Sequence, residues 1–238
     1  MAKTILHKAE SRNDANDDWL QIKDTFSFAL YHNPERMHFG MLQILNDDWV
    51  DGGVGFGAHD HNNMEIISIP LEGDLEHKDS NGNTAINNAG DEQVISADTE
   101  GEHTGHDKDL DKPRQLLQIW VLPDKKEVQP GYDQLSLNPA DRHNKLQLII
   151  SPKRSEGGVV WINQNAWCNL ANFDKGIKTT YQIHTKENGV YVFVLNGDIT
   201  VNNQPLNTRD GFGLWDIEEV FISADRDAEF LLTEVPMN

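Results

Sequence analysis

Apolar and polar positions alternate with a period of two, rather than 3.6, along most of the chain. The alternation is clearest in short segments that are rich in β-branched or aromatic residues and end at Gly or Pro: 64–73, 115–123, 145–152, 189–197 and 228–236. A period of two places successive side chains on opposite faces of a strand. The pattern therefore predicts β-strands, and no segment shows a helical pattern of comparable length.

Turn-forming residues separate these strands at close intervals. Clusters of Gly, Asn, Asp and Pro occur at 79–83, 87–91, 129–133, 155–158, 186–189 and 202–207. Short strands joined by such turns are typical of antiparallel sandwiches and barrels. The chain is therefore predicted to be all-β.

A weak internal repeat indicates how the strands are grouped. The segment LEGDLEHKD (71–79) resembles LNGDITVNN (195–203), at an offset of 124 residues. A repeated strand, Gly-Asp turn and strand favours two jelly-roll (double-stranded β-helix) halves, with a boundary near the Pro-, Gly- and Asn-rich stretch 129–144. The alternative is a chance likeness between two β-hairpins, because only nine positions are matched.

Composition restricts the class of partner. The 238 residues include 39 Asp and Glu against 20 Lys and Arg, which gives a formal charge of −19. This charge repels nucleic acids and anionic membrane surfaces. The longest apolar run, Val190–Leu195, is far too short for a membrane helix, and residues 1–19 lack the apolar core of a signal peptide. We expect a cytosolic protein that binds neither nucleic acid nor membrane.

Two histidines provide the strongest candidate for site chemistry. His59 and His61 are spaced i, i+2 and are followed by Glu65. On a strand such residues share a face, with α-carbons about 6.5 Å apart, so both imidazoles could reach one metal ion. Glu65 is an even number of residues from both histidines, so it would lie on the same face of an unbroken strand. The alternative is a solvated histidine pair without a ligand.

A second histidine cluster and one cysteine complete the inventory of candidate residues. The segment EHTGHD places His103 and His106 about forty residues after the first pair, in a Gly-containing loop. A distant loop of this kind could supply the third ligand of a metal ion. The single cysteine, Cys168, permits no internal disulfide and has no neighbouring base, so we predict a packing role.

The spacing around the first histidine pair resembles the first motif of the cupin superfamily. Gly53 precedes His59 by six positions, Glu65 follows His61 by four, and Gly73 ends the strand. Several segments in order extend the likeness to the pirin family of bicupins: 19–31, 59–83, 90–97, 116–123 and, more thinly, 189–199. The resemblance implies two cupin domains in one chain, an N-terminal domain over 1–135 and a C-terminal domain over 136–238.

The pirin resemblance also implies a cofactor and an activity. Family members hold one divalent transition metal, commonly Fe²⁺, in the N-terminal cupin through a His-x-His pair and a later His-x-Glu pair. His59, His61 and His103 match three of these ligands, and three imidazoles suit Fe²⁺, Ni²⁺ or Zn²⁺. The implied activity is that of a quercetin 2,3-dioxygenase, which acts on a small flavonol-like substrate.

The family's glutamate is missing, because Gly105 occupies its position. That glutamate supplies negative charge and is the favoured general base, so its loss should reduce activity before it reduces metal affinity. Three residues are candidates to replace it: Glu65, where many other cupins carry a carboxylate ligand; His106, as a further ligand; and Glu102. The remaining alternatives are a water ligand and a site without metal.

The second repeat is predicted to lack a metal site. At the offset of the repeat, Ile183 and Thr185 take the places of His59 and His61, and Gly189 takes the place of Glu65. His184 falls between them and is interpreted as a packing or surface histidine. Two functions are therefore in competition: an oxygenase with impaired or altered activity, and a non-enzymatic cupin that acts as a binding or regulatory protein.

Overall fold

The computed structural model describes the backbone of residues 2–17, 19–51, 56–61, 63–73, 75–79, 84–87, 91–97, 101–106, 114–125 and 131–238. It describes the side chains in these ranges except those at 17, 56–61, 75–106 and 131. Within these ranges the regular elements are β-strands and two 3-10 turns, η1 (Ala9–Ser11) and η2 (Pro139–Asp141). The predicted all-β class is confirmed. The described residues contain no helix that could span a membrane.

The N-terminal half forms two facing sheets. The larger sheet has the order β12 (Gly131–Ser136), β9 (Asp91–Ala97), β6 (Met64–Glu72), β11 (Arg114–Val121), β4 (Leu42–Val50), β3 (Leu20–Asp24) and β2 (Asn13–Asp17). The smaller sheet has the order β5 (Phe56–His61), β10 (Gly101–His106), β7 (Leu75–Asp79) and β8 (Thr84–Asn87). Neighbouring strands are antiparallel, as in a jelly roll.

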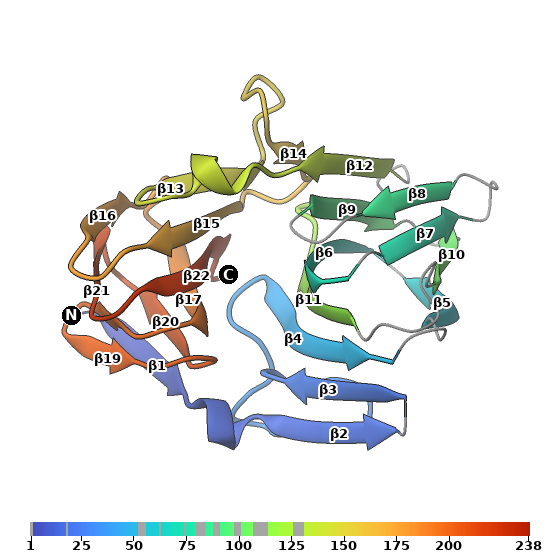
Figure 1. Ribbon diagram of the computed structural model, residues 1–238, viewed down its shortest axis with the longest axis horizontal. Helices are drawn as coiled ribbons and strands as arrows, with labels where there is room; N and C mark the ends of the chain where they lie inside the picture. The colour runs from blue at the N-terminus through green and yellow to red at the C-terminus, as the bar shows by residue number, and fades with distance from the viewer. Residues whose placement is uncertain are drawn as a thin grey trace.

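The C-terminal half is built in the same way. Its larger sheet has the order β1 (Lys3–His7), β20 (Gly211–Trp215), β17 (Asn188–Asn196), β22 (Ala228–Pro236), β15 (Trp167–Phe173), β13 (Leu146–Ser151) and β14 (Val160–Trp161). The smaller sheet has the order β16 (Lys178–Gln182), β21 (Glu219–Ala224), β18 (Ile199–Val201) and β19 (Gln204–Leu206). Figure 1 shows the two halves side by side, with the C-terminus between them.

The strands from β4 to β11 and from β15 to β22 follow the same order in the two halves, which confirms the repeat predicted from residues 71–79 and 195–203. The outer strands differ, because β14 pairs in parallel with β13 whereas β2 pairs antiparallel with β3. β6 and β17 hold the same place in their sheets, and each leads through a tight turn into the smaller sheet. Gly73 and Gly197 occupy these turns with φ of 75° and 81°, a conformation that favours glycine. A Cβ on Gly197 would lie 2.0 Å from the carbonyl oxygen of Asp227, so a side chain cannot be accommodated there.

One edge strand departs from the predicted domain division. β1 precedes the N-terminal half in sequence but pairs with β20 in the C-terminal sheet, where it occupies the place that β12 holds beside β9. Residues 3–7 therefore belong structurally to the second half, although the sequence division assigned them to the first. The strand joins the two halves through main-chain hydrogen bonds as well as through packing.

The two larger sheets pack face to face around a shared apolar core. β17 shows how alternation divides its residues between two cores: Val192 and Val194 point into the C-terminal barrel, while Tyr191 and Phe193 belong to the core between the halves. Ile67 and Leu117 meet this shared core from the N-terminal sheet. Cys168 is fully buried in it, which confirms the predicted packing role. The halves are therefore expected to unfold together.

Strand β1, which pairs in the C-terminal sheet, ends in a buried histidine, His7. The Nδ1 atom of His7 lies 2.8 Å from the hydroxyl oxygen of Tyr191, and its ring packs edge-on against Phe26 at 5.6 Å. Burial and the nearby charge of Arg36 lower the pKa of His7 to about 4. The histidine is thus neutral in the folded protein at pH 6, where the unfolded chain would be partly protonated.

We predict that His7 makes stability depend on pH between about 6.5 and 4. Because its pKa is lower in the folded state, the unfolded state binds more protons in this window, and the free energy of unfolding should fall with pH by up to about 3 kcal/mol. Urea unfolding of the wild type and His7→Phe at pH 7.5, 5.5 and 4.5 measures the difference. Identical pH profiles of the two proteins would contradict this origin.

Candidate functional site

Two strands of the small N-terminal sheet bring the predicted metal ligands together in register. β5 and β10 pair antiparallel, with His103 directly opposite His59 and Gly101 opposite His61. Opposite residues of an antiparallel pair share a face, as do residues two apart on one strand. Positions 59, 61 and 103 therefore lie on one face of the sheet. The side chains at these positions lie outside the described part of the chain.

His103 and His106 lie on strand β10 and not in the loop that the sequence indicated, so strand pairing decides which face each residue of this cluster occupies. β10 pairs regularly with β7 from His103, opposite Asp79, to His106, opposite Glu76. Position 105 therefore shares the face of His103, whereas positions 102 and 106 lie on the other face. The register with β5 shifts between His103 and Gly105. The alternation favours Gly105, rather than His106 or Glu102, as the place where a fourth group would join the histidines.

Glu65 makes contacts that the sequence did not predict. Its side chain is fully buried on β6, and its carboxylate accepts hydrogen bonds from the backbone N–H groups of Asn163 at 2.5 Å and Gln164 at 3.0 Å. The side-chain amide of Asn163 donates a third at 3.1 Å. These contacts tie the strand after the His-x-His pair to the C-terminal half. They favour an anchoring role over the catalytic role expected for Glu65.

The C-terminal barrel has a polar cluster at the position equivalent to the histidine pair. β16 and β21 take the places of β5 and β10, and Ile183, His184 and Thr185 follow β16. Ile183 packs against the C-terminal core, as its apolar character requires. Among the side chains that the structure describes, no group of three His, Cys, Asp or Glu could hold a metal ion.

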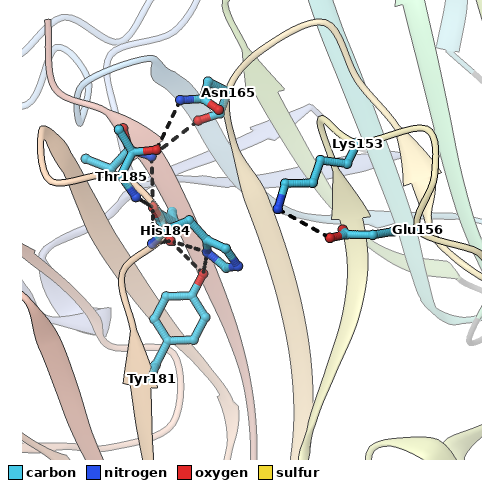
Figure 2. Close-up of polar contacts among 8 residues, drawn as sticks. Lys153, Glu156, Asn165, Tyr181, His184 and Thr185 are labelled. Atoms are coloured by element: carbon cyan, nitrogen blue, oxygen red, sulfur yellow. Dashed lines mark hydrogen bonds and ion pairs between the residues drawn. The ribbon is translucent and has the colours of Figure 1, made fainter.

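His184, interpreted from the sequence as a packing or surface histidine, makes specific polar and aromatic contacts. Its Nδ1 atom lies 2.8 Å from a carboxylate oxygen of Glu234, and its ring stacks on Trp167 with the planes 2° apart and the centroids 4.2 Å apart. Figure 2 shows the imidazole between Tyr181 and Thr185. The hydrogen bond from Nδ1 fixes the orientation of the ring.

Glu234 is the centre of this cluster and is fully buried. Besides the imidazole, its carboxylate accepts hydrogen bonds from the Tyr181 hydroxyl at 2.7 Å, the Asn188 amide at 2.9 Å and the backbone N–H groups of His184 and Thr185. Burial alone would raise the pKa of Glu234, but the hydrogen bonds, led by that from His184, outweigh it and lower the pKa. The carboxylate is therefore ionised at neutral pH.

Residues 163–165 of the C-terminal half contact Glu65 directly and also contact two residues that donate to Glu234. Asn163 and Gln164 donate to Glu65, and the next residue, Asn165, contacts the hydroxyl of Thr185 at 3.3 Å (Figure 2). The Asn188 amide, which donates to Glu234, also lies 3.3 Å from the carbonyl oxygen of Asn165. Residues 163–165 therefore connect the strand that follows His59 and His61 with the His184 cluster.

Comparisons with known proteins agree with this architecture. The pirin family model matches residues 7–121, and the model of the quercetinase C-terminal cupin domain matches residues 148–235. A quercetin 2,3-dioxygenase of Escherichia coli K12 is 36% identical over 231 residues, covering 97% of this chain and 98% of that protein. A pirin-like protein of Caulobacter vibrioides is 33% identical over 220 residues, covering 92% and 94%.

Solved structures give the same result. The crystal structure of the bacterial pirin YhhW of Escherichia coli, in complex with nickel(II), superposes with a TM-score of 0.92 at 35% sequence identity. The match covers 98% of this chain and 99% of that one. Both halves, their order and their strand topology are therefore those expected from the sequence resemblance. The chain belongs to the pirin family of bicupins and is related to quercetin 2,3-dioxygenases.

Proposed function

We propose that this protein is a metal-dependent oxygenase of the quercetin 2,3-dioxygenase type, acting on a small flavonol-like molecule. The carrying observation is the register that puts positions 59, 61 and 103 on one face of the small N-terminal sheet. Three neutral imidazoles at such positions would suit Fe²⁺, Ni²⁺ or Zn²⁺. His59, His61 and His103 would hold the ion, which would supply Lewis-acid and, for iron, redox chemistry.

The glycine at position 105 should limit the rate of this reaction. Position 105 shares the face of His103, but glycine provides neither a ligand nor a proton acceptor there. A general base adds about 10²- to 10⁴-fold to the rate of a proton-transfer step, so its absence should make turnover slow. The contacts of Glu65 with residues 163 and 164 leave it as an anchor of the strand that follows the histidine pair.

Metal analysis tests the site itself. We predict near-stoichiometric transition metal in the purified wild type, and loss of most of it in His59→Ala and in His103→Ala, because each variant leaves two of three imidazoles. Elemental analysis after dialysis measures this. His143→Ala is the control, since His143 is exposed and pairs with Asp174 on the surface. Unchanged metal content in the two ligand variants would contradict the assignment.

Oxygen consumption separates the oxygenase from the non-enzymatic alternative. The glycine at position 105 favours that alternative, in which the protein binds a ligand or partner without turnover. Uptake of dioxygen by the iron-loaded protein with quercetin, above the rate of the metal-free protein, supports the oxygenase. Equal rates would leave the binding or regulatory function as the better account.

A further inference from the structure

A cavity of about 390 Å³ lies between the two halves, lined by residues of β6 and β11 and by residues of the C-terminal half. Its apolar wall includes Ile69 of β6 and, from the C-terminal half, Leu170 and Leu195. Arg142 and Arg209 also line it. Small-molecule sites commonly have volumes of roughly 300–1,000 Å³ and occur at domain interfaces. The cavity thus has a mixed lining, in which apolar side chains lie beside two guanidinium groups of the C-terminal half, two carboxylates and several neutral polar groups.

Arg142 has an incomplete set of partners. Its side chain is only 14% exposed, and the nearest carboxylate oxygen, on Glu229, lies 3.8 Å from Nη2, beyond hydrogen-bond distance. The Nη1 atom is buried without a hydrogen-bond partner among the described residues. Buried guanidinium groups are normally satisfied by several acceptors, often a bidentate carboxylate. Arg142 therefore has capacity to bind an additional anion.

Arg209 shows the same deficit. Its Nε atom lies 3.3 Å from an oxygen of Asp47, a fully buried carboxylate that also pairs with Arg12 at 3.8 Å. One carboxylate thus faces two guanidinium groups, and the Nη1 atom of Arg209 is buried without a hydrogen bond to described residues. The backbone of Arg209 has φ of 68°, a left-handed conformation that is costly for a non-glycine residue and recurs at binding sites.

The two arginines that line the cavity are less exposed than its two glutamates. Arg142 and Arg209 have side chains that are 14% and 21% exposed. The acidic residues of the lining are more accessible: the Glu229 side chain is 38% exposed, and Glu72 is exposed. Among the lining residues the guanidinium groups are therefore the less accessible charges and the carboxylates the more accessible ones, while Asp47, behind the lining, partly balances Arg209. This arrangement suits a ligand that enters with a buried anionic group.

We propose that this interdomain cavity binds a small organic carboxylate with an apolar body. The carboxylate accepts hydrogen bonds from Arg142 and Arg209, and the body contacts Ile69, Leu170 and Leu195. The site is separate from the proposed metal centre and does not depend on it. Because its walls come from both halves, occupancy stabilises the interface between them.

Benzoate is a suitable probe, because it combines a carboxylate with a compact apolar ring. We expect saturable binding of benzoate by calorimetry and a rise in melting temperature, with binding weakened about tenfold or more in Arg142→Gln and in Arg209→Gln. Arg226→Gln removes the same charge from an exposed arginine and should bind as the wild type does. Benzamide, with the same ring and no charge, should bind far more weakly than benzoate.

Two further measurements keep the result interpretable if an arginine variant fails to fold. Glu229→Gln removes the carboxylate near Arg142 from a partly exposed position and should tighten benzoate binding severalfold. His59→Ala should leave binding unchanged, which distinguishes this cavity from benzoate bound to a metal ion. The proposal is overturned if benzoate does not saturate, if folded Arg142→Gln binds it equally well, or if inorganic phosphate binds as tightly and displaces it.

Discussion

Gly105→Glu is expected to raise the rate of quercetin oxidation per bound metal by about 100-fold or more, within the range attributed to a positioned general base. Position 105 lies two residues after His103 on β10, and the regular pairing with β7 keeps both on one face of the sheet. A glutamate there adds a proton acceptor and a negative charge beside the three histidine positions. Oxygen uptake, normalised to metal content, measures the effect.

Two matched variants isolate the cause of such an increase. Gly105→Gln introduces a side chain of similar shape that accepts protons poorly, so it should remain close to the wild-type rate. Thr104→Glu adds the same charge at the neighbouring position, which lies on the other face of β10, opposite Lys78. If Gly105→Glu is no faster than these variants, the missing glutamate does not limit turnover, and the non-enzymatic function gains support.

The fold was predictable because its determinants are local and repeated. Strand alternation, Gly- and Asn-rich turns and the match between residues 71–79 and 195–203 each reflect backbone geometry, and the strands from β4 to β11 and from β15 to β22 follow the same order. The strand order and the turns depend little on side chains from elsewhere in the chain. The register of His59 with His103 was not predicted, because the sequence indicated a loop for His103 and His106, whereas both lie on β10, which pairs with β5.

The features that the sequence did not reveal depend on partners far apart in the chain. Glu65 is bound by residues 98 and 99 positions away, and β1 pairs with a strand more than 200 residues later. No local pattern specifies such contacts. Glu234 did leave a signal: it continues the core-facing series of Phe230 and Leu232 on β22, where a charged residue requires buried partners.

Replacing Glu234 by alanine is expected to destabilise the protein by about 3–5 kcal/mol, because several donors lose their acceptor at about 1–3 kcal/mol for each buried group left unsatisfied. The variant would leave the Tyr181 hydroxyl and the Asn188 amide without their acceptor, together with donors of His184 and Thr185. Urea unfolding at pH 7.5 measures the loss. Glu187→Ala is the control, since this exposed glutamate of the same half should change stability by about 0.5 kcal/mol at most.

The pH dependence of this loss tests the electrostatic origin. Because the pKa of Glu234 is lower in the folded state, its ionised form stabilises the protein above the ordinary glutamate pKa of 4.5, and this contribution is lost as the pH falls through the folded value. The difference between the wild type and Glu234→Ala should therefore shrink below about pH 4.5. Unfolding the two proteins at pH 7.5 and at successively lower pH follows this change. A difference that stays constant as the pH falls would mean that Glu234 acts through packing rather than through its charge.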